Sequence, residues 1–120
     1  MVRGDADLII GLRGDPQFSP IVLVGFGGVL VEILGDVAIA PAPVSADQAM
    51  AMLRRLKLWP LLLGARGRQL LDTARLSQMV ERLSWLGRDL GPRLIELELN
   101  PVLVGPASAI AVDGRATLGA

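Results

Sequence analysis

The sequence contains no cysteine and no histidine, and its 120 residues include only two Phe, two Trp and no Tyr. Without cysteine the chain forms no disulfide, thiolate zinc site or cysteine nucleophile, a composition that suits a cytoplasmic protein. Without histidine it carries no Ser-His-Asp triad, no histidine metal site and no phosphohistidine of its own. The few aromatic residues and the net charge of zero give no reason to expect a nucleic-acid partner.

Aliphatic residues dominate what is present: the chain is 52% hydrophobic, with a mean hydropathy of +0.51. A chain of this length buries one core and is too short for two domains, so we expect a single domain over residues 1–120. Such a high apolar fraction exceeds what a small free-standing domain can hide, because small domains have much surface for their volume. We therefore expect another domain or subunit to cover one face, and a homo-oligomer is compatible with this.

The stretch IVLVGFGGVLV, residues 21–31, places eleven uncharged residues in a row before Glu32. A bilayer span needs roughly 20 predominantly apolar residues, so this run is too short. The chain opens with MVRGDADLIIG, which has acidic residues where a signal peptide carries a basic region. We interpret the run as part of a soluble core and expect no association with a membrane.

Five segments have the composition of strands. Residues 7–15 and 21–26 are aliphatic runs separated by GDPQFSP, whose Gly, Asp and Pro residues mark a loop, and they predict an antiparallel pair. Pro41 and Pro43 confine a third segment, residues 37–44, to a sheet edge or a strand end. Residues 94–104 and 109–118 predict two more strands, joined by the turn GPAS at residues 105–108.

Two segments have the pattern of helices. Ser45 and Gln48 have capping-box spacing and predict a helix that begins after Ser45. A connection rich in Pro and Gly at residues 59–69 leads to a longer helix from about Asp72 to Leu90. Its apolar side chains fall on one stripe: Leu76, Met79, Val80, Leu83, Leu86 and Leu90. The predicted fold is α+β, a mainly antiparallel sheet with two helical segments packed on one side.

The segment LIELELNP carries the polar pattern of greatest interest. The strand period of two places its apolar side chains, Ile95 included, on one face and its polar side chains, Glu98 and Asn100 included, on the other. A hairpin that turns at GPAS pairs Asn100 with Asp113 and Glu98 with Arg115. Asn100 and Asp113 can then share one hard cation such as Mg²⁺, which prefers oxygen ligands. An exposed hairpin face with one Glu–Arg pair explains the pattern equally well, and a register slip of one residue separates the two ligands.

Three motifs, in order, carry a family resemblance. DLIIGLRGDPQFSPIVLVGFGGVLVEILGDVA at residues 7–38, then LELNPVLV and AVDGR, resemble the ATP-grasp domain of ADP-forming acyl-CoA synthetases. This is the acetate–CoA ligase family, related to the β subunit of succinyl-CoA synthetase. The match runs nearly the whole chain with the motifs in the right order and spacing. It implies the C-terminal lobe of an ATP-grasp domain, with Mg²⁺ and ATP or ADP as cofactors.

The resemblance also implies site residues. Asn100 and Asp113 fall on the Mg²⁺ ligands of the family, the same pair that the hairpin register selects. Glu98 falls on the acidic residue of the family's E-x-N element, and no catalytic residue is implied on this chain. The candidate nucleotide contacts are Glu98, Gly27, Gly28 and Glu32. Whether the two glycines contact phosphate stays open, because close packing alone explains them equally well.

The resemblance covers only part of the family's domain. The part that should hold the adenine pocket and the phosphate-binding lysine has no counterpart here, and the only lysine, Lys57, lies in the wrong place. The expected function is therefore the nucleotide- and Mg²⁺-binding lobe of a ligase that converts acid, CoA and ATP to acyl-CoA, ADP and phosphate. We expect it to be inactive alone, with the remainder of the domain and a CoA-binding domain or subunit as partners. The alternative is a non-catalytic remnant or assembly domain of the same fold, and neither the acyl substrate nor the choice between adenine and guanine follows from these residues.

Overall fold

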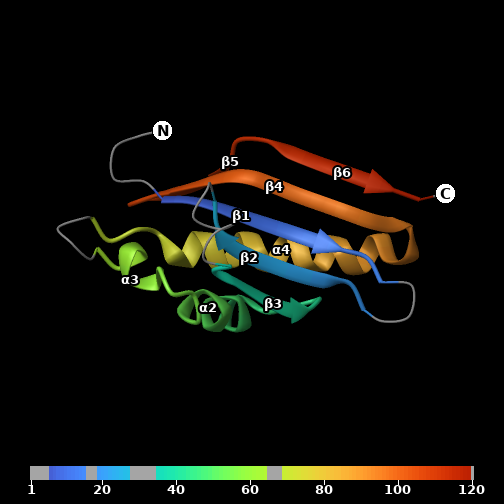
Figure 1. Cartoon of the computed structure of the whole chain (residues 1–120), viewed down its shortest axis with the longest axis horizontal. Coiled ribbons are helices and arrows are strands. Elements are labelled where there is room, and N and C mark those ends of the chain that lie inside the picture. The colour runs from blue at the N-terminus through green and yellow to red at the C-terminus, as the bar shows by residue number, and fades with distance from the viewer. Residues whose placement is uncertain (1–5, 16–18, 28–34, 65–68, 120) are drawn as a thin grey trace.

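The computed structural model describes residues 6–15, 19–27, 35–64 and 69–119, which form an antiparallel sheet with helices on one face (Figure 1). The strands are β1 (Ala6–Arg13), β2 (Ile21–Phe26), β3 (Val37–Pro41), β4 (Leu94–Gly105), β5 (Ser108–Ala111) and β6 (Gly114–Leu118). Their order is β3-β2-β1-β4-β5, and β6 also pairs with β4. The predicted antiparallel pair is confirmed as β1 and β2, and the proline-rich segment is confirmed as the edge strand β3.

The last predicted strand is two short strands, β5 and β6, which pair with successive parts of β4. The break between them lies opposite Asn100 and Pro101, where the pairing of β4 with β1 is also irregular. Proline has no amide hydrogen to donate, so a regular ladder cannot continue through Pro101. The break therefore coincides with the NP dipeptide of the predicted hairpin.

Helix α2 (Ala46–Arg54) begins directly after Ser45, as its capping signal predicts, and α4 (Thr73–Leu90) lies where the longer helix was predicted. The one-turn helix α3 (Trp59–Leu62) lies between them, and a short 3₁₀ turn, η2 (Gly91–Arg93), follows α4. The Ser45 hydroxyl accepts a hydrogen bond from the Gln48 amide (3.1 Å) and the Gln48 side chain accepts one from the Ser45 amide (2.8 Å), which confirms the capping box. The predicted connection at residues 59–69 contains the one-turn helix α3, where Pro60 occupies a first-turn position that tolerates its missing amide hydrogen. No helix among the described segments has the length and apolar character needed to cross a membrane.

The core lies between one face of the sheet and the helices α2 and α4 (Figure 1). Alternate residues of β1 point into it, so that Leu8, Ile10 and Leu12 are buried while Ile9 and Arg13 lie on the opposite face. Two hydrogen bonds link the start of α2 to α4: the Val44 amide donates to the buried Ser84 hydroxyl (3.0 Å), and the Ala46 amide donates to the Glu81 carboxylate (3.0 Å). Both helices pack on the same side of the sheet, as predicted (Figure 1).

Two details of the predicted faces are wrong. Leu76, Val80 and Leu83 of α4 are buried as predicted, but Leu86 is 41% exposed. The helix instead turns the small residues Ser77, Ser84 and Gly87 inward. The reason is close packing on β1, since a Cβ atom at Gly87 would lie 3.1 Å from the side chain of Leu12.

Ile95 is the second such detail, being 51% exposed although the alternation places it with the buried Leu97. The pairing of β4 with β6 shifts by one residue between Leu94 and Glu96. A one-residue shift reverses the face of the side chains that precede it. Leu94 is therefore buried in place of Ile95.

Candidate functional site

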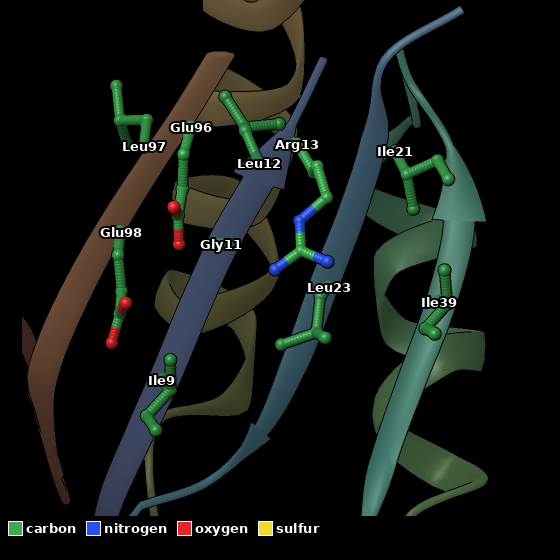
Figure 2. Close-up of a pocket in the computed structure, with 10 residues that line it drawn as sticks. All are labelled: Ile9, Gly11, Leu12, Arg13, Ile21, Leu23, Ile39, Glu96, Leu97 and Glu98. Atoms are coloured by element: carbon green, nitrogen blue, oxygen red, sulfur yellow. The ribbon is translucent and has the colours of Figure 1, made fainter. Parts of the chain in front are cut away.

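One face of the sheet, which none of the helices α2, α3 and α4 covers, is hollowed at three adjoining places. An apolar hollow of about 270 Å³ lies over β1, β2 and β3, with Ile9, Leu23 and Ile39 among its walls (Figure 2). Two polar hollows of about 200 and 340 Å³ lie over β4 and β6. Glu98 lines all three, so they form one continuous surface with an apolar part and a carboxylate-lined part.

The polar part is positioned by the β4–β5–β6 hairpin in the predicted register. Gly105 pairs with Ser108 across a two-residue turn, and Glu98 lies opposite Arg115. The Asn100 amide donates to the Asp113 carbonyl (3.1 Å), which places these two residues directly across from each other. Glu98, Asn100 and Asp113 line the same hollow of about 200 Å³. The prediction that Asn100 and Asp113 share one face is therefore confirmed.

The side chains in this hollow offer several oxygen atoms as possible metal ligands. The Asn100 Nδ2 atom donates to Glu98 Oε1 (2.9 Å), and the Arg115 guanidinium lies 3.8 Å from Glu98 Oε2. Asp113 Oδ1 accepts from the Gly114 amide (2.8 Å). Asn100 and Asp113 are exposed, whereas the Glu98 side chain is only 25% exposed. Solvent therefore has access to the possible metal-ligand atoms that face the hollow.

The chemistry of these donors fits a magnesium ion. Two carboxylates and one amide supply hard oxygen ligands, and Mg²⁺ normally keeps several waters and takes substrate phosphates for the rest of its shell. The described residues contain no group of three or more His, Cys, Asp or Glu side chains placed to bind a metal by themselves. An ion bound here therefore depends on water and on a ligand to complete its shell.

Of the two candidate glycines, Gly27 and Gly28, only Gly27 lies within the described residues. The Gly27 amide donates to the Asp7 carbonyl (2.7 Å), and a Cβ atom at Gly27 would collide with the Asp7 carboxyl group. A larger residue at this position would displace the Asp7 side chain, which supports the close-packing interpretation of Gly27. Gly28 and Glu32 lie outside the described residues.

The apolar part of the surface contains residues that the sequence analysis did not select. Gly11 and Arg13 line it from β1, and Glu96 lines it from β4 (Figure 2). The signal that identifies the β1 residues is the period of two, because residues 9, 11 and 13 alternate with the buried residues 8, 10 and 12. What the pattern does not reveal is that the helices of the described segments all lie on the other face.

Comparison with known proteins matches nearly the whole chain to one kind of domain. The family model for the ATP-grasp domain matches residues 1–118. The β subunit of ADP-forming acetate–CoA ligase I from Pyrococcus furiosus is 39% identical over 112 residues, which are 93% of this chain and 48% of that subunit. ADP-forming acetate–CoA ligase I from Archaeoglobus fulgidus is 40% identical over 119 residues, which are 99% of this chain and 17% of that protein. The chain thus spans at most about half the length of these relatives.

The fold is shared with a solved enzyme structure. The dinucleotide-forming acetyl-coenzyme A synthetase 1 of Ca. Korarchaeum cryptofilum, in complex with coenzyme A and Mg-AMPPCP, superposes with a TM-score of 0.88 at 38% sequence identity. The match covers 95% of this chain and 53% of that one. It supports the predicted α+β fold and extends over nearly the whole sheet and helix layer described above.

Proposed function

Because the chain belongs to the family of ATP-grasp domains, we propose that it forms the nucleotide- and Mg²⁺-binding lobe of an ADP-forming acyl-CoA ligase. The complete enzyme would convert an acid, CoA and ATP to acyl-CoA, ADP and phosphate, or catalyse the reverse reaction. Its remaining parts would be the rest of the ATP-grasp domain and a CoA-binding domain or subunit. The proposal treats residues 1–120 as one unit, a partial ATP-grasp domain.

The observation that carries the proposal is the continuous surface on the open face of the sheet. A nucleotide bound with magnesium has an apolar, planar part and a charged, metal-coordinated part, and it needs both kinds of surface in one place. The hollow over β1, β2 and β3 offers the first, and the hollow around Glu98, Asn100 and Asp113 offers the second. The two meet at Glu98, which belongs to both.

Asn100 and Asp113 would hold the magnesium ion, with Glu98 beside them. When bound, the ion supplies positive charge that offsets the negative charge on the phosphate groups. The chain's own part is to present these oxygen atoms from one rigid hairpin. The hydrogen bond from Asn100 to Glu98 holds the amide nitrogen toward Glu98 and leaves the amide oxygen available to the hollow. This arrangement supports the assignment of Asn100 as a ligand.

A chimeric enzyme tests the proposal. The region of the Pyrococcus furiosus β subunit that matches this chain is replaced by the chain, and CoA-thioester formation is measured with ATP and MgCl₂. We expect nucleotide-dependent thioester formation that is lost in the Asp113→Asn variant and kept in Arg82→Gln, a surface control on α4. A chimera that folds and assembles like the parent subunit but forms no thioester would favour the non-catalytic assembly domain instead.

A further inference from the structure

One charged group on the open face has no role in the proposed metal site: the guanidinium of Arg13. Arg13 is the last residue of β1, is exposed, and lies opposite Glu96 of β4 and Ile21 of β2. Neither of the salt bridges found in the described segments, Arg75–Asp72 and Arg115–Glu98, involves Arg13 or its cross-strand neighbour Glu96. Figure 2 shows the side chain extended over the sheet, with the guanidinium between Gly11 and Leu23.

Gly11 lines the same hollow beside this guanidinium (Figure 2), and neither crowding nor backbone conformation explains why it is a glycine. A Cβ atom there would lie 3.7 Å from the Leu97 carbonyl oxygen and 4.0 Å from Leu23 Cδ2, both ordinary contact distances. Its φ angle is not among the positive values, which belong to Gly35, Gly64 and Gly91 in the described segments. A glycine inside a strand weakens it and often marks a place where a ligand approaches the backbone closely.

Arg13 is the positively charged residue among the charged side chains that line the apolar hollow. The other charged residues that line it are Glu96 and Glu98, which repel an anion. The Arg13 guanidinium supplies the opposite charge and a planar pair of N–H donors that match the oxygen atoms of a phosphate or carboxylate. The apolar walls at Ile9 and Leu23 reduce the competition from water and strengthen that contact.

We propose that Arg13 is a positioning residue that binds an oxyanion of the ligand, and that Gly11 lets the body of the ligand lie directly on β1. The inference rests on the proposed function, in which the ligands are a magnesium nucleotide and an organic acid. The oxyanion is a phosphate of the nucleotide or the carboxylate of the acid, which present the same chemistry to a guanidinium. The two sources are distinguished by titrating them separately.

The test is an NMR titration of the ¹⁵N-labelled 120-residue chain with Mg–ATP and, in a second series, with sodium acetate. Binding shifts the Gly11 amide and the Arg13 side-chain Nε–Hε resonance in the series that supplies the oxyanion. Arg13→Met weakens that binding about tenfold, as expected for the loss of a charge-assisted hydrogen bond. Arg13→Lys has a smaller effect because it keeps the positive charge and loses only the planar pair of N–H donors. Arg82→Met, which removes the same charge from the outer face of α4, changes the affinity less than about twofold.

Gly11→Val provides a steric test that leaves the charge in place. It fills part of the hollow, so it weakens binding, while circular dichroism should show an unchanged sheet because valine suits a strand. If Arg13→Met and Arg82→Met bind alike, the role of Arg13 is overturned. If in addition Mg–ATP still shifts the resonances of Asn100 and Asp113 in both variants, the proposed function stands without it. If neither Mg–ATP nor acetate shifts the Gly11 and Arg13 resonances of the wild-type chain, the role of Arg13 is overturned. If Mg–ATP also leaves the resonances of Asn100 and Asp113 unchanged, the proposed function fails with it.

Discussion

Replacing Asp36 with alanine probes a buried carboxylate that connects the sheet to the helical layer. Asp36 is 3% exposed, and its two carboxylate oxygens accept hydrogen bonds from the backbone amides of Lys57 (2.6 Å) and Leu58 (3.0 Å). It thereby holds the residues before β3 against the turn between α2 and α3. Alanine removes both acceptors and leaves two amides to find water in a partly buried place. The substitution therefore acts on packing and on hydrogen bonding together.

The expected loss follows from these two bonds. A hydrogen bond to a charged group contributes roughly 1.5–3 kcal/mol, but the partly buried amides regain some hydration, so we expect Asp36→Ala to lower the free energy of unfolding by about 3 kcal/mol. Asp36→Asn keeps the shape and one acceptor and should lose about half as much. With a urea m value of roughly 1–3 kcal/mol/M, the alanine variant's midpoint should fall by about 1–3 M.

Urea unfolding followed by far-UV circular dichroism measures both variants, with Asp89→Ala as the matched control. Asp89 is exposed in the last turn of α4, where an acidic side chain opposes the helix dipole, so its removal should leave the midpoint unchanged or raise it slightly. Equal midpoints for Asp36→Ala and Asp89→Ala would refute the anchoring role. A changed m value would show instead that the variant alters the unfolded or native ensemble rather than one contact.

Three further outcomes are expected. Asn100→Ala and Asp113→Ala should change the unfolding free energy of the 120-residue chain by less than about 0.5 kcal/mol, measured by urea titration, because both side chains are exposed. In a complete enzyme the same substitutions should lower kcat on the order of 10²-fold, measured by steady-state kinetics. Gly14→Ala should cost roughly 3 kcal/mol in a thermal melt because its Cβ collides with a backbone carbonyl of β4, whereas Gly11→Ala should cost less than about 1 kcal/mol. Because the open face and its β3 edge expose apolar side chains such as Ile39 (54% exposed), light scattering at high concentration should show self-association, and a monodisperse monomer would contradict this.

The hairpin that brings Asn100 and Asp113 together was predictable because two independent constraints agree on its register. The alternation in β4 assigns faces, and the turn at GPAS assigns partners, so that the observed pairs Val104–Ala109 and Glu98–Arg115 both follow from counting outward from one turn. The interruption at Asn100 does not disturb this count, since it affects the pairing with β1 and leaves the pairing with β5 and β6 in register.

The buried face of α4 was only partly predictable, for a different physical reason. Apolar side chains indicate the general direction of a helix's buried stripe, but small residues decide how closely the helix approaches its neighbours. Gly87 lies against Leu12, and Ser84 satisfies its hydroxyl with Val44. Both favour a rotation that exposes Leu86. A hydropathy pattern assigns no inward preference to Ser or Gly, so this rotation is a property of the packed structure.

The excess of apolar residues in the composition and the candidate site lie on the same surface, the open face of the sheet. Strands that face water on one side alternate apolar and polar residues, whereas strands covered on both sides are apolar throughout. β1 and β2 are of the second kind, with LIIGL and IVLV as their central sequences, yet the helices of the described segments cover only one of their faces. The excess of apolar residues therefore has a definite location, the surface that also holds Gly11, Arg13 and Glu98. The relatives are about twice the length of this chain or more, so they contain further chain to cover it. A ligand enclosed between that additional part and this sheet would be shielded from water on both sides, which strengthens the contacts made by Arg13 and by the carboxylates of the hairpin. The same residues that leave the isolated lobe prone to self-association would then form the wall of a closed site.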